Sequence, residues 1–369
     1  MIITVNKSEL LNGITIAMRA VAAGGIMPIL GCLLIETVDD CGIQIMGNNL
    51  ELCIQTKGIE ADITEGGSIA LDARLLSEIV KKLPDGDISI AIDKKFIATI
   101  KSGKRKFTVL GQNGADFPAM PVLEKSKGFS MQSASLRNML RQTVFAANID
   151  APKPALTGLL IEAEGGKINV AACDGFRIAY RYGKINAANT SFKVIIPAKS
   201  IGEIQRLLPS DNEYEMIAHF TDKQILFELE DCKISSRLIE GEFVNYQKML
   251  NSESSTTAKI NRAELLNSLE CASIIALENS KRMPVTMELD EDKITITARA
   301  ERGQLHEETE AIIDGDNLTI GFNPRFLIDA LKAIDDTEIE IQFGDAQSPC
   351  IIKPITDGNF KYLVMPLKL

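Results

Sequence analysis

Residues 70–85 read ALDARLLSEIVKKLPD, and similar stretches occur twice more, as IPAKSIGEIQRLLPSD at 196–211 and FNPRFLIDALKAIDD at 322–336. Each stretch begins with the apolar residues of a short strand and continues with the apolar spacing of an amphipathic helix. A basic residue near the helix start recurs after 125 and then 126 positions, as Arg74, Lys199 and Arg325. A motif that returns at a fixed period predicts a chain built from three copies of one unit.

Other parts of the chain recur at the same period. An apolar, β-rich run lies near the start of each third, at 31–36, 156–162 and 285–290. The triplet DFP at 116–118 returns as EFV at 242–244, which is 126 positions later. A triplicated domain indicates an arc or a ring of similar units more than a single catalytic cleft.

Length and composition agree with a multidomain globular protein. The chain has 369 residues, which is too long for one ordinary core but allows three units of about 123 residues each. Hydrophobic residues make up 45% and charged residues 24% of the chain, and no apolar run reaches the roughly 18 residues of a membrane span. The N-terminus reads as a strand and lacks the parts of a signal peptide, so we expect a cytoplasmic protein.

Two helices are predicted in each third of the chain. The first follows an N-terminal strand and is capped by Asn6 or Ser8. The other expected helices span 72–83, 133–148, 197–208, 261–277 and 323–334. Strands are more numerous, including 32–36, 43–46, 50–56 and 88–92, so each unit has an α+β pattern. Polar or proline-containing linkers place the domain boundaries so that the domains span 1–122, 123–252 and 253–369.

The chain carries few residues that suggest catalysis or metal binding. Its seven cysteines are scattered and never spaced Cys-x-x-Cys, so we expect neither disulfides nor a zinc site. The two histidines, His219 and His306, are isolated, and no common nucleotide-binding or hydrolase motif occurs. We therefore expect a binding protein without metal or cofactor.

Many of the basic residues fall on the predicted helices. Arg74 and Lys81 share one helical face, as do Arg137 and Arg141. The candidate DNA-facing residues are Arg19, Arg74, Lys81, Arg137, Arg141, Lys199, Arg206 and Arg325. Although the net charge is −10, helices that face one centre would give a positive inner surface able to hold DNA phosphates. The alternative is that each of these residues belongs to the ordinary solvated side of a helix.

Several motifs, in order along the whole chain, resemble those of bacterial sliding clamps, the beta subunit of DNA polymerase III. They are MPILG at 27–31, ACDGFRIA at 172–179, LIEGEFVNY at 238–246, GFN at 321–323 and YLVMPLKL at 362–369. The resemblance implies an α+β fold of three DNA-clamp domains, each with two helices and antiparallel sheets. It further implies that two subunits join head to tail into a closed ring of six domains.

The same resemblance implies a function without catalysis. Such a ring encircles double-stranded DNA, independently of sequence, and acts as the processivity subunit of the DNA polymerase III holoenzyme. Its implied partners are the polymerase alpha subunit, a clamp loader, and other polymerases and repair proteins that carry clamp-binding peptides. Tethering raises the effective concentration of the polymerase at its template.

The resemblance also implies an apolar partner-peptide pocket between the second and third domains. Carried over onto this sequence, its residues are Leu156, Cys173, Gly175, Phe176, Arg177, Ile178, Val244, Lys248, Met249, Asn323, Phe326, Leu363, Val364, Met365, Pro366 and Leu367. The aliphatic side chains would form a slot, methionine would adapt to different ligands, and Arg177 would hold polar groups of the peptide. Phe176, Val244 and Ala155 depart from residues common in the family, which affects peptide preference.

The implied subunit interface pairs the first domain with the third. Its expected residues are Lys104, Arg105, Phe107, Val109, Ile274 and Ile275, with Glu301, Glu307 and Glu308 as possible acidic partners. The basic residues 104–106 could instead form a DNA-binding patch, and we prefer the interface.

Two other functions remain as alternatives. One is a repeat scaffold that binds only peptides, which would not be retained on circular DNA. The other is an enzyme with an unrecognised site, which would show an activity that depends on a single polar residue.

Overall fold

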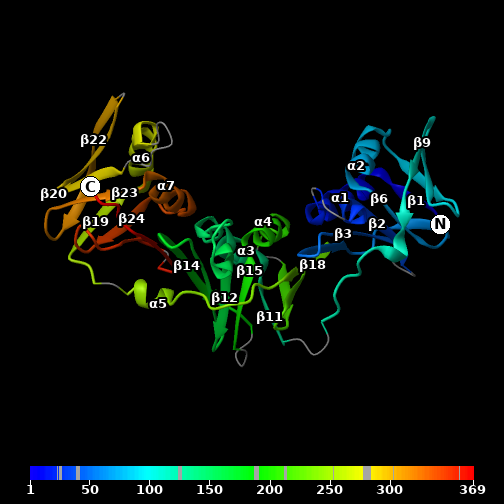
Figure 1. The fold of residues 1–369 in the computed structure, drawn as a ribbon, viewed down its shortest axis with the longest axis horizontal. Coiled ribbons are helices and arrows are strands. Elements are labelled where there is room, and N and C mark those ends of the chain that lie inside the picture. Colours follow the sequence, from blue (N-terminus) through cyan, green and yellow to red (C-terminus); the bar gives the residue numbers. More distant parts are fainter. Residues whose placement is uncertain are drawn as a thin grey trace. The chain divides into compact units, whose positions relative to one another are not determined.

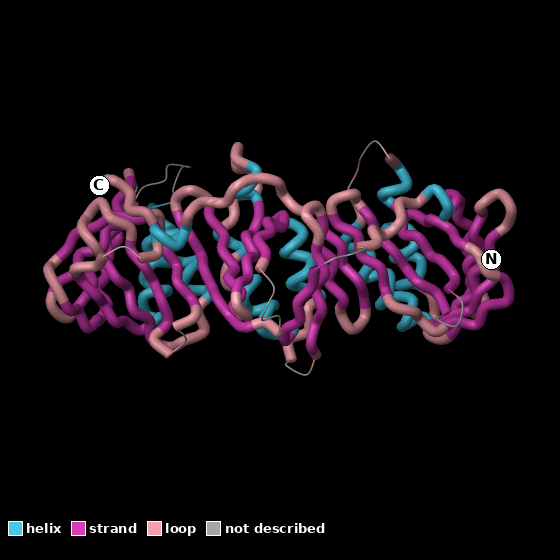
Figure 2. Tube along the Cα trace, turned by 90° about the horizontal axis from the view of Figure 1, so that it is seen from below, coloured by secondary structure: helices cyan, strands magenta, loops and turns pink. Residues whose placement is uncertain are grey.

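The computed structural model describes residues 1–22, 24, 27–38, 42–123, 127–186, 191–211, 214–251, 253–276, 284–301, 303–356 and 358–369. Figure 1 traces the elements along the chain, and Figure 2 shows that strands make up more of the regular structure than helices. The α+β prediction is confirmed. Among the described residues, no helix combines the length and apolar character needed to cross a membrane.

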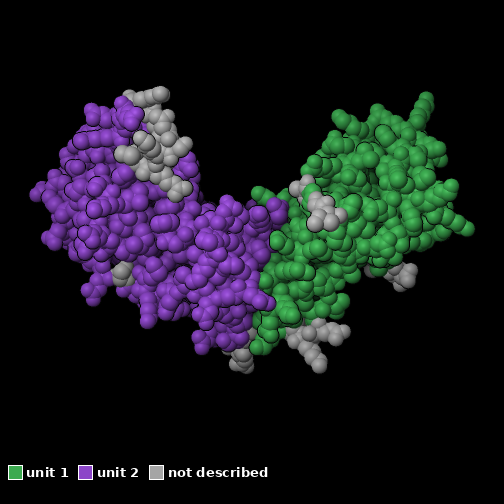
Figure 3. All heavy atoms as spheres, viewed as in Figure 1, with its two compact units in different colours: residues 1–134, 206–238 green, residues 135–205, 239–369 purple. Residues whose placement is uncertain are grey.

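The chain divides into two compact units, coloured separately in Figure 3. Unit 1 comprises residues 1–134 and 206–238, and unit 2 comprises residues 135–205 and 239–369. The neighbouring strands of each described sheet are antiparallel. All strands of a given sheet belong to the same unit.

Unit 1 holds two sheets. The five-stranded sheet has the order β5-β1-β7-β8-β9, and the nine-stranded sheet has the order β10-β6-β2-β3-β4-β18-β17-β16-β11. The strands are β1 (Ile2–Asn6), β2 (Cys32–Val38), β3 (Gly42–Asn48), β4 (Leu52–Thr56), β5 (Ala61–Glu65), β6 (Ser68–Asp72), β7 (Asp87–Ile92), β8 (Ile97–Ser102), β9 (Arg105–Leu110), β10 (Gln112–Asn113), β11 (Lys127–Gln132), β16 (Glu215–Phe220), β17 (Gln224–Glu228) and β18 (Cys232–Arg237). Its helices are α1 (Lys7–Ala17) and α2 (Ala73–Lys82).

Unit 2 contains one twelve-stranded sheet in the order β15-β12-β13-β14-β26-β25-β24-β19-β22-β21-β20-β23. The strands are β12 (Gly158–Glu164), β13 (Lys167–Cys173), β14 (Arg177–Lys184), β15 (Phe192–Pro197), β19 (Thr256–Asn261), β20 (Val285–Asp290), β21 (Lys293–Ala300), β22 (Gly303–Asp314), β23 (Leu318–Phe322), β24 (Glu338–Phe343), β25 (Cys350–Pro354) and β26 (Phe360–Val364). The remaining helices are α3 (Ser133–Arg141), α4 (Ala198–Leu207), α5 (Tyr246–Met249), α6 (Arg262–Ala276) and α7 (Pro324–Ala333). In Figure 1, α6 and α7 lie side by side, and their residues are in contact.

Apart from the short α5, each α-helix directly follows a strand, as the repeated motif predicts. Polar side chains at the junctions explain why the helices begin there. Asp72 accepts a hydrogen bond from the Leu75 backbone N–H at 2.8 Å at the start of α2, and Asn6 caps α1 through Ser8. Helix α2 ends just before Pro84, which cannot continue a helix.

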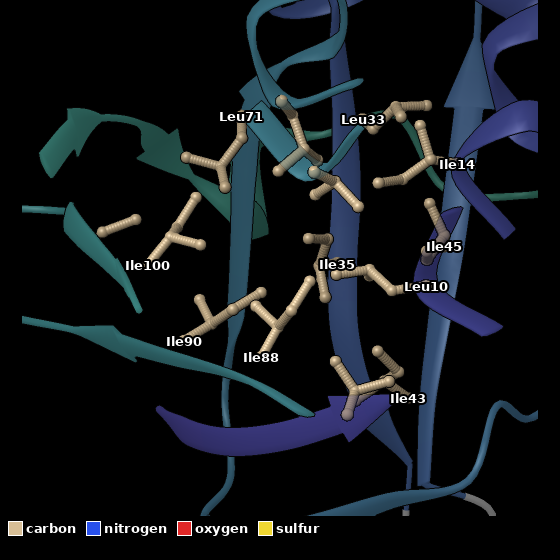
Figure 4. Close-up of a cluster of buried hydrophobic side chains, with 14 of the residues drawn as sticks. Leu10, Ile14, Leu33, Ile35, Ile43, Ile45, Leu71, Ile88, Ile90 and Ile100 are labelled. Carbon is tan, nitrogen blue, oxygen red and sulfur yellow. The ribbon is translucent and has the colours of Figure 1, made fainter. Parts of the chain in front are cut away.

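The core of unit 1 explains how α1 joins the sheets. Figure 4 shows Leu10 and Ile14 of α1 among side chains of the surrounding strands, including Ile35, Ile45 and Ile90. All five side chains are completely buried. Burial of each such side chain stabilises the fold by about 1.5–3 kcal/mol before the cost of chain ordering is subtracted.

Two predicted boundaries were wrong. The helix expected over 133–148 ends at Arg141, because Thr143 leaves helical geometry and its backbone N–H donates to the Leu140 carbonyl. The Met139 carbonyl accepts from the Thr143 hydroxyl instead, at 2.7 Å. The strand expected from position 50 begins at Leu52, because Leu50 has a positive φ of 72° that no strand residue adopts. The expected end of α6 at Leu277 lies outside the described residues.

The cysteines of the described residues are free, and most are buried. Burial raises the pKa of the Cys53 thiol to about 12, and burial raises that of Cys232 to about 12 as well. These two thiols therefore behave as small apolar core groups at neutral pH. Cys41 lies outside the described residues.

Candidate partner-binding site

The candidate site of unit 2 begins at the tight turn between β13 and β14. The Asp174 carboxylate accepts hydrogen bonds from the backbone N–H groups of Phe176 and Arg177, at 2.9 and 3.0 Å. Gly175 has a φ of 95°, a conformation that glycine adopts without a steric cost. The turn leaves the Phe176 ring 58% exposed and points the chain into β14.

Arg177 is the most heavily bonded side chain of this region. Its Nε donates to Asp174 at 2.8 Å, and Nη1 donates to Asp329 at 2.6 Å and to the Tyr362 hydroxyl at 3.2 Å. Nη2 donates to the Phe145 carbonyl oxygen at 2.7 Å. Arg177 thereby joins β14 to β26, to α7 and to the segment after α3.

Aromatic rings complete the surroundings of this guanidinium. Its carbon lies 4.6 Å from the centre of the Phe326 ring and 5.7 Å from that of Phe145. Arg177 is only 9% exposed. Its donors are therefore largely used within the chain, which differs from the expectation that they bind polar groups of a peptide.

An apolar cluster lies beside the turn. We define the unit 2 cluster by the buried residues Ala155, Leu160, Ala171, Cys173, Ile178, Ile195, Phe243, Tyr246, Leu250 and Leu363, against which Leu156, Val244 and Met365 pack partly buried. Ile178 of β14 pairs with Leu363 of β26 in the antiparallel ladder, so residues distant in sequence meet here. Met249 nearby in the chain is 40% exposed.

The C-terminal segment is fixed to this region by backbone hydrogen bonds. The Met365 N–H donates to the Phe176 carbonyl at 2.9 Å, and the Leu367 N–H donates to the Gly321 carbonyl at 2.8 Å. Val364 is completely buried, whereas Met365, Pro366 and Leu367 are half-buried. A chain end ordered in this way can contribute to a binding surface.

The remaining expected residues have more local roles. Asn323 is 6% exposed and caps α7 by accepting from the Arg325 N–H at 3.1 Å. Lys248 is exposed on the short α5. Phe243 and Tyr246 also belong to the cluster but are not among the expected site residues, although both lie in the motif at 238–246.

The expected DNA-facing residues all lie on helical segments. Arg74 and Lys81 of α2, Lys199 and Arg206 of α4, and Arg325 of α7 are exposed. The other three are half-buried: Arg19 in the turn after α1, and Arg137 and Arg141 on α3. Arg141 forms an ion pair with Asp335.

The expected interface residues lie on β9, on the turn before it and on α6. Lys104 and Arg105 are exposed, and β9 is an edge strand of its sheet. Phe107 is half-buried against the unit 1 core and Val109 is 9% exposed within it. On α6, Ile274 is 74% exposed and Ile275 is half-buried.

The acidic residues expected to face Lys104 and Arg105 have bonds within unit 2. Glu308 pairs with Lys293 at 2.8 Å across the β21–β22 ladder. Glu307 accepts a hydrogen bond from the Ser268 hydroxyl at 2.8 Å. Glu301 is exposed.

Three repeats of strand–helix pairs, antiparallel sheets and exposed basic residues on equivalent helices define the class of DNA-clamp proteins. Comparison with known families gives three consecutive matches. The N-terminal, central and C-terminal domains of the DNA polymerase III beta subunit match residues 1–121, 130–245 and 247–368.

Individual relatives agree over almost the whole chain. A beta sliding clamp from Synechocystis sp. is 32% identical over 384 aligned positions, which cover 98% of each protein. A crystal structure described as a putative DNA polymerase III beta subunit from Eubacterium rectale is 36% identical with a TM-score of 0.94, covering 100% of both chains. The sliding clamp structure from Bacillus subtilis is 30% identical with a TM-score of 0.95, covering 100% of this chain and 99% of that one.

The chain belongs to the DNA polymerase III beta subunit family, the bacterial beta sliding clamps. This membership confirms the predicted family, the repeated α+β clamp fold and the function of a DNA sliding clamp that serves as a processivity factor.

Proposed function

We propose that two copies of this chain join head to tail into a closed ring of six domains around double-stranded DNA. The three domains would span 1–122, 123–252 and 253–369. The three consecutive family matches and the threefold sequence repeat support this division. A closed ring remains on DNA by topology, so it needs no tight contact and can slide.

The observation that carries the DNA-binding role is the recurrence of an exposed cation in equivalent helices. Arg74, Lys199 and Arg325 occupy the same place in α2, α4 and α7 and are all exposed. With Arg19, Lys81, Arg137, Arg141 and Arg206 they would contact phosphates and not base edges. Such contacts hold any duplex without reading its sequence.

The partner site would be the unit 2 cluster with its exposed neighbours. Phe176 and Met249 present apolar surface, and Met365 lies partly buried against the cluster. In this proposal, Arg177 fixes the walls of the site and does not bind the peptide, because its donors are engaged within the chain. The partners would be the polymerase alpha subunit, the clamp loader, and other polymerases and repair proteins, in the cytoplasm.

The ring is tested by loading the protein with a clamp loader onto nicked circular DNA and separating bound from free protein by gel filtration. We expect retention on the circle and loss after the circle is cut to a linear form. Equal retention on circular and linear DNA would contradict a topological link. A known clamp loaded in parallel controls for an inactive loader.

The partner site is tested separately with Met365→Asp. A carboxylate beside the apolar cluster should lower the affinity of the polymerase alpha subunit at least tenfold, measured by surface plasmon resonance. Ile355→Asp is the matched control, because Ile355 is 42% exposed and lies outside the cluster. Equal affinities of both variants would contradict the assignment of this site.

A further inference from the structure

Unit 1 contains an apolar cluster that repeats part of the unit 2 cluster. We define the unit 1 cluster by Ile29, Leu30, Cys32, Leu34, Met46, Cys53, Ala70 and Phe117, all of them buried. Leu34, Met46, Cys53, Ala70 and Phe117 correspond to Leu160, Ala171, Ile178, Ile195 and Phe243, each 125 or 126 positions later. A short 3₁₀-helix beginning with proline belongs to each cluster, at Pro28–Gly31 and Pro154–Thr157.

The turn between β13 and β14 also has a counterpart in unit 1, the turn between β3 and β4. The Asn49 side-chain oxygen accepts from the N–H groups of Glu51 and Leu52, at 3.0 and 2.8 Å, as Asp174 does for its own turn. Leu50, with a φ of 72°, occupies the place that Gly175 fills with a φ of 95°.

A leucine in this conformation is strained, whereas a glycine is not. The Leu50 side chain is nevertheless 41% exposed to solvent, so burial in the core does not explain its presence. Strained residues concentrate at functional sites, where the strained geometry presents a side chain. Leu50 is therefore an indication that this turn binds a partner.

The strand paired with β4 in unit 1 corresponds to the strand paired with β14 in unit 2. Leu52 and Cys53 of β4 pair with Ser236 and Ser235 of β18, as Arg177 and Ile178 of β14 pair with Val364 and Leu363 of β26. Arg237 therefore follows the β18 pair in the place where Met365 follows the β26 pair. Glu51 in turn occupies the place of Phe176.

A cavity of about 110 Å³ lies beside the β3–β4 turn and β18. Its lining includes Leu50, Glu51, Cys53, Pro118, Ser235 and Arg237. This volume equals about three or four water molecules, so it holds a single side chain and not a cofactor. Glu51 and Arg237 are both exposed, and the Arg237 backbone N–H donates to the Glu51 carbonyl at 2.8 Å, so the two residues are neighbours. Within the part of the chain that the structure describes, neither side chain forms an ion pair.

We propose that this cavity is a second partner site, which binds an extended peptide segment of a protein that uses the clamp. One small apolar side chain of the peptide enters the cavity beside Leu50 and Pro118. An acidic residue on one side of it pairs with Arg237, and a basic residue on the other side pairs with Glu51. The proposal rests on the peptide-binding role of the unit 2 cluster, and the mixed charge distinguishes the ligands of the two sites.

The test uses the full-length protein with Met365→Asp, so that the unit 2 site is disabled. The probes are the fluorescein-labelled peptides Gly-Lys-Ala-Leu-Asp-Gly and Gly-Asp-Ala-Leu-Lys-Gly, together with the uncharged Gly-Gln-Ala-Leu-Asn-Gly. Fluorescence polarisation should show that one charged order binds at least tenfold more tightly than the uncharged peptide. Similar affinities for all three peptides would overturn the proposal.

Charge reversal then locates the bound peptide. Arg237→Glu should lower the affinity of the preferred peptide at least tenfold, and adding Glu51→Lys should transfer the preference to the peptide of opposite charge order. Lys57→Glu, an exposed charge reversal just after β4, is the matched control and should change nothing. An unchanged affinity in Arg237→Glu, or an equal loss in Lys57→Glu, would overturn the site.

Leu50→Gly separates binding from folding. Because glycine removes the strain at this turn, the variant should melt at the same or a higher temperature while binding the preferred peptide at least fivefold more weakly. Unchanged binding would overturn the role of Leu50. Retention of the parent protein on circular DNA is measured in parallel, so failure of this second site is distinguishable from failure of the clamp function.

Discussion

At the scale of single residues, Arg177 shows how one side chain can determine the shape of a site without being exposed in it. The sequence places it in a turn motif, where an arginine is a natural ligand for a peptide. Its bonds to Asp174, Asp329, Tyr362 and the Phe145 carbonyl arise only because four separate segments meet around it. No local pattern in the sequence indicates that these four segments lie around Arg177.

Replacing Arg177 should therefore be costly. Arg177→Ala leaves the Asp174 carboxylate, which is 11% exposed, without its cationic partner, so we expect a loss of about 3 kcal/mol in the free energy of unfolding. Arg141→Ala breaks the more exposed pair with Asp335 and should cost less than about 1 kcal/mol. Urea denaturation of both variants measures the difference, and equal losses would contradict the structural role of Arg177.

At the scale of elements, the strand–helix units were predictable because their signals are local. A polar cap such as Asp72, an amphipathic pattern and a following proline act within a few residues of each other. The end of α3 was not predictable in this way. The helical hydrogen-bond pattern stops at Thr143, whose N–H donates to the Leu140 carbonyl, and the Phe145 carbonyl accepts from Arg177.

Two glycines allow a matched test of how elements pack. A Cβ at Gly47 of β3 would lie 2.1 Å from the backbone oxygen of Ala17 at the end of α1, whereas one at Gly202 of α4 would meet nothing within 4 Å. Gly47→Ala should destabilise the protein by at least about 1–3 kcal/mol, because neither backbone segment can move freely. Gly202→Ala should stabilise it by about 0.5–1 kcal/mol. Thermal melting of the two variants should move in opposite directions.

At the scale of the whole molecule, β9 leaves one edge of its sheet unpaired among the residues that the structure describes. An exposed edge with apolar residues beside it is a common place for another chain to bind. Leu110, at the end of β9, is 76% exposed, and sequence reasoning did not include it in the interface. We expect it to contribute there with Phe107.

The proposed dimer can be weakened by charge reversal at the start of β9 and in the turn before it. The double variant Lys104→Glu and Arg105→Glu should raise the dimer dissociation constant at least tenfold, because the expected partner surface is acidic. Lys94→Glu with Lys95→Glu makes the same charge change at another exposed turn and should have no effect. Sedimentation velocity measures both, and an unchanged dimer in the first variant would contradict this interface.

The sequence by itself determined the repeat, the α+β character and the family, because these depend on local periodicity and on motifs that keep their order along the chain. It also predicted that Leu156, Cys173, Ile178, Val244, Leu363 and Met365 belong together, through the resemblance, and the structure unites them in one cluster. Only the tertiary structure decided that Arg177 is buried, that the C-terminal segment binds the Phe176 turn, and that a related cavity lies beside Leu50. These features depend on contacts between segments far apart in the chain, and such contacts leave no local periodic signal.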